Sequence, residues 1–195
     1  QHQVETGPPT RARRRGQEGE RHDRQRQQHP VQQSEDAGRG QPSPGAPEQL
    51  PRDEVLERLR PWLEDGSAAK LGQNIKYDLH VFANQGITVR GYTHDTLLQS
   101  YVLEAHKPHS LESLAERHLG RKGLSYEDLC GKGAHQIPFG QVDVDKAAEY
   151  SGEDSEMTLQ VHQTLWPQLE ADAKQRFVYE RIEMPVSDLL LRIER

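Results

Sequence analysis

Hydrophobic residues are distributed unevenly along this chain of 195 residues. Between residues 1 and 50 there is no Ile, Phe, Met, Trp or Tyr, and the only Leu is Leu50. A segment that cannot bury apolar surface cannot offset the entropy of ordering its backbone, so residues 1–43 are predicted to be disordered. The remaining part, about 145 residues, is long enough for one modest core.

Beyond this segment the spacing of apolar positions predicts a helix-rich α/β or α+β domain with a small sheet. Val55, Leu56, Leu59 and Leu63 would share one face of a helix that stops near Gly66. Residues 121–142 contain four Gly and one Pro and are predicted to be loop. Short strands are predicted over residues 69–71 and 87–90, and further helices over residues 75–85, 95–104, 110–120, 143–170 and 174–195.

Composition narrows the range of functions. The formal net charge is −6, and because residues 1–50 carry eight Arg against seven acidic residues, the rest of the chain is more acidic still. An acidic domain is a poor general binder of nucleic acid but suits a site that holds divalent metals with carboxylates. The single cysteine, Cys130, excludes an internal disulfide, and no apolar run is long enough for a membrane span. We therefore expect a cytoplasmic protein without a membrane partner, and the first residue, Gln1, indicates a fragment or an interrupted reading frame.

Two short segments carry candidate chemistry. Asn74 and Asp78 are four residues apart at a predicted helix start, and Tyr150 and Asp154 have the same spacing further on. This spacing places both side chains of a pair on one helical face, and it puts a phenol beside a carboxylate in the second pair. Taken alone, either pair is more often a helix cap or a surface hydrogen bond.

In their surroundings the two segments resemble known motifs. Lys70–Asp78 is similar to the second exonuclease motif of the proofreading domain in bacterial family A DNA polymerases, the DNA polymerase I family. Ala148–Leu159 is similar to the third motif in its tyrosine-bearing form. Four more segments resemble this family in the same order along the chain, namely Gly91–Tyr101, Ser113–Arg117, Gly131–Gly133 and Ile182–Pro185.

This resemblance, which covers residues 44–195, implies a ribonuclease H-like α/β fold. It implies a partial 3′–5′ exonuclease domain over residues 44–183, followed by the start of a connection to a polymerase domain over residues 184–195. The implied reaction is two-metal hydrolysis of the 3′-terminal phosphodiester of single-stranded DNA, with Mg²⁺ or Mn²⁺, by a monomer that serves DNA replication and repair. By the same resemblance Asp78 and Asp154 are metal ligands, Tyr150 orients the attacking water, and the residues beside the terminal nucleotide are Asn74, Tyr77 and His109.

One part of the family pattern is missing. The family uses four carboxylates, and two of them form an Asp-x-Glu motif on an opening strand upstream of the second motif. The acidic residues upstream, such as Glu18, Glu20, Glu35 and Asp36, have no β-branched or aromatic neighbours that would form a strand. We therefore expect an incomplete domain without its first strands, preceded by a disordered or frameshifted tail over residues 1–43, and with little or no nuclease activity.

Two other functions are compatible with the pattern. A non-catalytic structural module would not need Asp78, Tyr150 and Asp154, whose presence argues against it. An exoribonuclease of the ribonuclease D type would lack the Ile182–Pro185 segment, which points to the polymerase connection. His106 and His109 have zinc-like spacing, but no third ligand lies at a suitable distance in the sequence, so we interpret both as loop residues.

Overall fold

The structure, a computed structural model, describes residues 45–195. The predicted disordered or frameshifted tail, residues 1–43, lies outside the described residues. The same holds for Glu18, Glu20, Glu35 and Asp36, the acidic residues considered for the missing motif.

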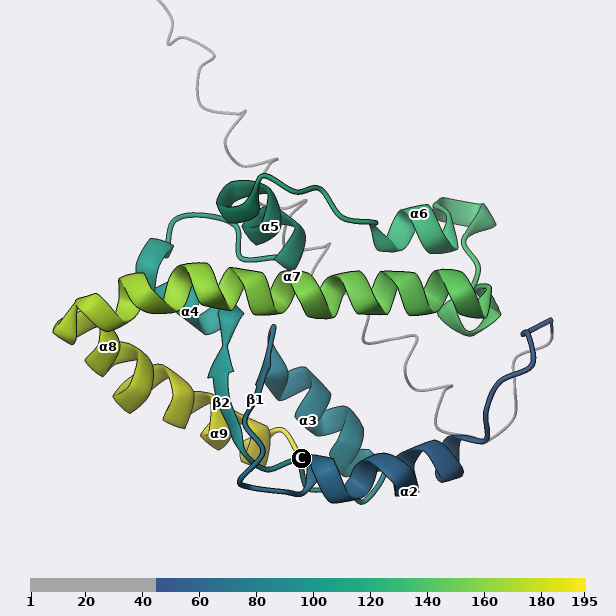
Figure 1. The fold of residues 1–195 in the computed structure, drawn as a ribbon, viewed down its shortest axis with the longest axis horizontal. Helices are drawn as coiled ribbons and strands as arrows, with labels where there is room; N and C mark the ends of the chain where they lie inside the picture. The colour runs from purple at the N-terminus through teal and green to yellow at the C-terminus, as the bar shows by residue number, and fades with distance from the viewer. Residues whose placement is uncertain (1–44) are drawn as a thin grey trace, which may run out of the picture. The chain divides into compact units, whose positions relative to one another are not determined.

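Two parallel strands and one crossover helix form the centre of the described part (Figure 1). Strand β1 (Lys70–Gly72) leads through helix α3 (Ile75–Asn84) to strand β2 (Tyr92–Asp95). Lys70 lies opposite Tyr92 and Gly72 lies opposite Asp95. The predicted first strand is thus confirmed with a shift of one residue, and the left-handed stop predicted at Gly86 is present, with φ of 69°.

The second predicted strand, over residues 87–90, is wrong. These residues adopt no strand, and β2 begins at Tyr92. The reason is that the Arg90 amide bonds back to the carbonyl of Leu63, and Gly91 then turns with φ of 72°. The β-branched residues Thr88 and Val89 therefore lie in an extended connection rather than in the sheet.

The remaining elements are helices. Their bounds are Arg52–Leu63 (α2), Thr96–Glu104 (α4), Leu111–Leu119 (α5), Tyr126–Cys130 (α6), Val144–Ala171 (α7), Ala173–Val178 (α8) and Met184–Ile193 (α9), with a π-helical turn at Tyr179–Glu183. The predicted helices are confirmed within a few residues at their ends. The prediction of loop over residues 121–142 is partly wrong, because Ser125 and Asp128 form a reciprocal capping box that starts α6.

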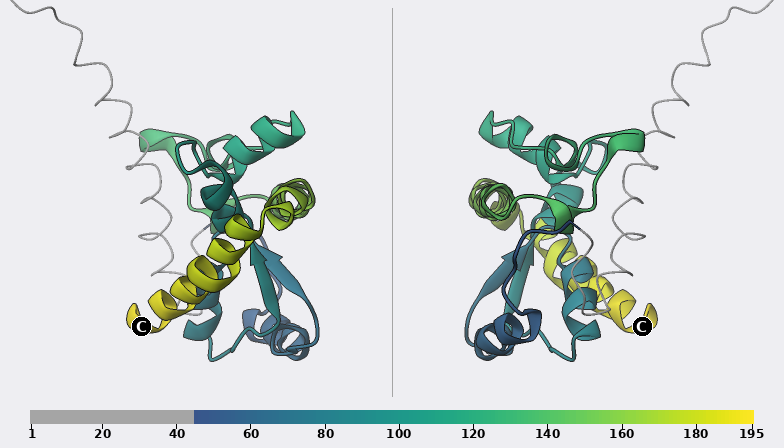
Figure 2. Two further views of the ribbon diagram at one scale, coloured as in Figure 1. Left: turned by 90° about the vertical axis from the view of Figure 1, so that its left-hand side faces the viewer. Right: turned by 90° about the vertical axis from the view of Figure 1, so that its right-hand side faces the viewer.

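The core lies where α4 and α5 pack against α7 (Figure 1). Its centre is the cluster of Leu114, Val161 and Leu165, around which Leu103, Leu111 and Leu119 pack. Helices α3 and α9 contact each other and lie on the same side of the two strands (Figure 2). The observed fold is helix-rich with a small parallel sheet, as predicted.

Within the described part of the chain, no helix is both long and apolar enough to cross a membrane.

Candidate active site

The turn between β1 and α3 holds the first pair of candidate residues. Asn74 precedes the helix and has a left-handed backbone, with φ of 57°; in residues 45–195 no other non-glycine residue has a positive φ. The amide of Asn74 donates to Asp95 Oδ1 at 3.0 Å, and the amide of Ile75 donates to Asp95 Oδ2 at 2.9 Å. Because Asn74 lies just outside the helix, helical spacing does not align its side chain with that of Asp78.

Asp78 lies in the first turn of α3. The residue is exposed to solvent, although many protein atoms surround its carboxyl group. The loss of hydration, together with repulsion by the nearby Asp95, raises the pKa of Asp78 to about 6. A cation beside this carboxylate would favour its charged form, so the surroundings of Asp78 suit a ligand for a hard cation.

The second pair of candidate residues lies in α7. The Tyr150 hydroxyl lies near the Asp154 carboxylate one turn later, close enough for the two groups to shift each other's pKa, so the predicted neighbouring phenol and carboxylate are present. Burial and the charge of Asp154 raise the pKa of Tyr150, which keeps the phenol protonated at neutral pH. Burial also raises the pKa of Asp154, and the charges of Glu153 and Glu112 add to this, while the Tyr150 hydroxyl acts in the opposite direction.

Three residues around Tyr150 were not predicted from the sequence to lie near it. The ring of Phe139 lies 6.2 Å from that of Tyr150, and the ring of Tyr126 stacks on Phe139 at 6.3 Å. Glu112, in the first turn of α5, is close enough for its charge to act on Tyr150 and Asp154. Phe139 and Tyr126 belong to the segment that was predicted to be loop, where only the spacing of Ser125 and Asp128 signalled a helix.

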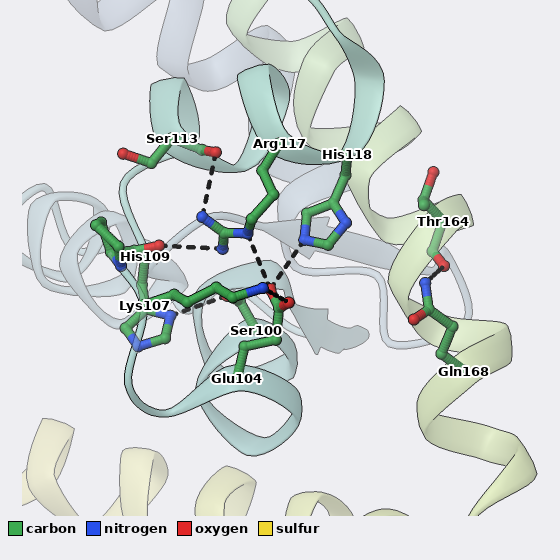
Figure 3. A network of polar contacts seen from close by, with 10 residues as sticks. Ser100, Glu104, Lys107, His109, Ser113, Arg117, His118, Thr164 and Gln168 are labelled. Atoms are coloured by element: carbon green, nitrogen blue, oxygen red, sulfur yellow. Dashed lines mark hydrogen bonds and ion pairs between the residues drawn. The ribbon is translucent and has the colours of Figure 1, made fainter.

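His109 lies in the loop between α4 and α5, where a polar network holds it (Figure 3). Its Nδ1 pairs with Ser100 Oγ at 2.8 Å, and its carbonyl accepts a bond of 2.8 Å from Gln73 Nε2, which ties this loop to the turn before α3. Desolvation lowers the pKa of His109, so the ring is neutral at pH 7. Its side chain therefore has a structural partner within the chain.

The network around His109 is anchored on Glu104 (Figure 3). Glu104 accepts from Arg117 Nε at 2.9 Å and also contacts Lys107 and His118. The hydrogen bonds and charges of Lys107 and Arg117 hold the pKa of Glu104 at about 2. Arg117 in turn donates to the carbonyl of Pro108 at 3.1 Å, so the loop that carries His109 is fixed from both sides.

The structure brings the two motifs to neighbouring elements, because β1, which leads into Asp78, contacts α7, which carries Asp154. Tyr77 is half-buried, and its amide bonds to the Asn74 carbonyl at 3.0 Å. In residues 45–195 no group of three or more His, Cys, Asp or Glu side chains is placed to hold a metal ion. No third ligand among these residues therefore supports a zinc site at His106 and His109. The carboxylate oxygens of Asp78 and Asp154 are of the kind that hard cations bind, but two carboxylates are too few for the four that the family uses.

Comparison with known proteins shows the family of the chain. Residues 43–170 match the profile of a 3′–5′ exonuclease, the exonuclease domain of DNA polymerase A. The chain belongs to this 3′–5′ exonuclease family. It is 46% identical over 154 residues to the DNA polymerase I of Pseudomonas aeruginosa, covering 77% of this chain and 17% of that protein. It is 40% identical over 150 residues to the DNA polymerase I of Rhizobium leguminosarum, covering 76% and 15%.

A solved structure shares the fold of this exonuclease-family chain. The POL domain of Pol1 from M. smegmatis, in complex with DNA primer-template and dNTP, matches with a TM-score of 0.57 and 23% identity, covering 76% of this chain and 22% of that one. The family match and the two relatives confirm the family resemblance inferred from the sequence motifs. The chain spans only 17% and 15% of the two curated relatives described above, so it corresponds to the exonuclease region of much longer proteins.

Proposed function

We propose that this chain is part of a bacterial DNA polymerase I and supplies most of its proofreading site, which removes nucleotides from the 3′ end of single-stranded DNA. Its membership of a nuclease family supports the reaction class. The observation that carries the proposal is the pairing of Tyr150 with Asp154 on α7, a helix that also contacts β1, the strand that leads to Asp78. We further propose that the whole protein joins this domain to a polymerase domain and acts as a cytoplasmic monomer.

In the proposed reaction, Asp78 and Asp154 are ligands of two divalent metal ions, Mg²⁺ or Mn²⁺. Such ions activate a water molecule and stabilise the leaving oxygen in phosphodiester hydrolysis. The protonated hydroxyl of Tyr150 lies near Asp154 and orients the attacking water. Asn74 and Tyr77 lie beside the terminal nucleotide, and His109 contacts the DNA strand from its fixed loop.

We also propose that the chain as it stands is inactive. The family pattern requires two further carboxylates from an opening strand, and the described residues bring no third metal-ligating side chain to Asp78 or Asp154. An incomplete ligand set holds metal ions weakly and places them poorly, and misplacement of a catalytic group by about 1 Å can cost a factor of about 100 in rate. The site therefore needs the strand that carries the missing motif.

The first test uses the chain itself and single-stranded DNA labelled at its 3′ end. We expect no Mg²⁺- or Mn²⁺-dependent shortening above the level of the Asp154→Ala variant. Appreciable shortening that disappears in the Asp154→Ala variant would contradict the proposed inactivity. A preference for RNA ends over DNA ends would support the ribonuclease D-like alternative instead.

The second test restores the missing strand. A chimera would join the upstream exonuclease segment of the Pseudomonas aeruginosa relative to residues 44–195 of this chain. We expect this chimera to degrade DNA from the 3′ end. The Asp78→Ala and Asp154→Ala variants should each lose at least about 100-fold in rate, and Tyr150→Phe about 10-fold.

The matched control for the chimera is Asp145→Ala, an exposed carboxylate in the first turn of the same helix α7. It should leave the rate unchanged. An active chimera in which Asp78→Ala and Asp154→Ala have no effect would reject these two residues as metal ligands. A chimera that folds but has no activity would favour the alternative of a structural module.

A further inference from the structure

Asp95, at the end of β2, connects the starts of two helices. Its carboxylate is buried and caps α4 by accepting from the Leu97 amide at 2.9 Å. The same carboxylate accepts from the amides of Asn74 and Ile75 at the start of α3. A single buried side chain thus satisfies unpaired backbone donors of both α3 and α4.

The position of Asp95 is fixed by its own surroundings. Its amide donates to the hydroxyl of Tyr179 at 2.9 Å, and Tyr179 is fully buried in the π-helical turn that follows α8. The neighbouring Thr96 hydroxyl donates to the carbonyl of Gly72 at 3.2 Å, which ties the end of β2 to the end of β1. The Asp95 oxygens are engaged by three amides, so this carboxylate is not available as a substitute for the missing metal ligands.

The bonds from Asp95 act where the backbone is strained. Left-handed backbone is unfavourable for a residue with a Cβ atom, and it persists only where the surrounding structure holds it. The side chain of Asn74 makes no capping hydrogen bond of its own. Its amide is held by Asp95, and so is the amide of the next residue, Ile75.

We infer that Asp95 is a positioning residue, which holds Asn74 in its left-handed conformation and thereby sets the direction in which α3 presents Asp78. This inference rests on the proposed role of Asp78 in metal binding. The bonds themselves are independent of that role, and they make Asp95 more than a cap for α4. Asp78 follows Asn74 by one helical turn, so a change in the turn at Asn74 changes where α3 begins and where Asp78 points.

The test is an NMR comparison of the full chain with its Asp95→Asn variant, which keeps the side-chain size but turns one oxygen into a donor facing the Ile75 amide. In the wild type, Asn74 should show the short distance between its own amide and Hα protons that is typical of left-handed residues. In the variant this signature should disappear, and the Cα shifts of residues 73–78 should move. A variant that is only less stable would keep the wild-type shifts in its folded state, and this result would overturn the inference.

The matched control is Asp143→Asn. Asp143 caps α7 by accepting from two amides, at 3.1 and 3.2 Å, but it has no role at α3. Because Asn caps a helix about as well as Asp, its substitution should change the midpoint of thermal unfolding little and leave residues 73–78 unchanged. None of these measurements depends on metal binding or nuclease activity, so failure of the proposed function and failure of this inference give different results.

A second variant, Asn74→Gly, tests the strain at residue 74 in a protein that keeps Asp95. Glycine adopts the left-handed conformation without strain, so Asn74→Gly should raise the unfolding midpoint of the wild type by about 1–3 °C. In an Asp95→Asn background that does fold, the same substitution should give no gain, because residue 74 is no longer held. A lower midpoint for Asn74→Gly in the wild-type background would contradict the inference.

Discussion

His94 is a half-buried histidine surrounded by other rings. Its ring centroid lies 4.5 Å from that of His162 and 4.4 Å from that of Trp166, and the Tyr179 hydroxyl is 3.4 Å from its Nδ1. Burial and the charge of a protonated His162 together lower the pKa of His94 to about 4, while Glu180 acts in the opposite direction. Both histidines are therefore neutral in the folded protein at pH 7.

This cluster predicts a loss of stability in mild acid. Between pH 6.5 and about 4 the unfolded chain binds a proton at His94 and the folded chain does not, so the free energy of unfolding falls as the pH is lowered. We expect the contribution of His94 to fall by at most about 2 kcal/mol between pH 6.5 and pH 5. Urea unfolding at pH 7.5 and pH 5 measures it.

The comparison protein for this measurement is His94→Phe, which should lose much of the pH dependence. The raised pKa of Asp78 acts in the opposite direction over part of the same range, so only the difference between the two proteins isolates His94. His135→Phe, at an exposed histidine, should behave as the wild type does. An equal pH dependence in wild type and His94→Phe would show that His94 is not the responsible group.

At the scale of elements, the small sheet depends on Gly91. This residue has φ of 72°, and a Cβ atom at its position would lie 2.5 Å from the Ala68 carbonyl oxygen and 2.9 Å from that of Asp65. Its own carbonyl accepts from the Lys70 amide at 2.8 Å, which pairs the start of β1 with the chain entering β2. Both the backbone angle and the close approach therefore require glycine.

We predict that Gly91→Ala lowers the free energy of unfolding by about 3 kcal/mol, because left-handed strain and a steric clash add. Gly86→Ala is the matched control, since Gly86 has φ of 69° but open space around its Cβ position. It should cost only about 1 kcal/mol, from strain alone. Equal losses measured by chemical denaturation would show that the backbone of Gly91 moves away from Ala68 at little cost.

The sequence predicted the elements whose signals are local. The helices that start at Thr96, Leu111 and Val144 have a capping Asp or Ser directly before them. The spacing of four residues between Tyr150 and Asp154 was enough to predict that the two side chains are neighbours. The features that were missed depend on contacts between distant residues. The β-branched residues before Gly91 led to the prediction of a strand that is not formed. The hydrogen bond between Asp95 and Asn74 joins residues 21 positions apart, and no pattern in the sequence indicates it.

At the scale of the whole molecule, one face of α9 is left uncovered. Glu194 pairs with Lys76 at 2.6 Å and with His80 at 3.1 Å, which fastens the end of α9 to α3. Four apolar side chains of α9 are exposed: Val186 by 43%, Leu189 by 55%, Leu190 by 40% and Ile193 by 68%. A contiguous apolar face of this kind favours association with other protein surfaces.

We predict that the separate chain self-associates through this face, although the family resemblance implies a monomer for the whole protein. The double variant Leu189→Lys, Ile193→Lys should shift the chain toward monomer in sedimentation-velocity experiments, because two charges would have to be buried at the contact. Leu159→Lys is the control, since Leu159 is 44% exposed on α7, away from α9. Equal association of the double variant and the wild type would place the contact elsewhere.

The two ends of helix α7 differ in how deeply their side chains are buried. Its buried residues are Met157, Thr158, Val161, Leu165 and Leu169, all C-terminal to Asp154, whereas Tyr150 and Asp154 lie in the N-terminal part, which has no buried residue. Local opening of a helix is easiest where few apolar contacts hold it. We therefore expect the part of α7 before Met157 to open more readily than the part that packs in the core. If Tyr150 and Asp154 have the proposed catalytic roles, they would be able to adjust to a substrate while the anchored part preserves their register.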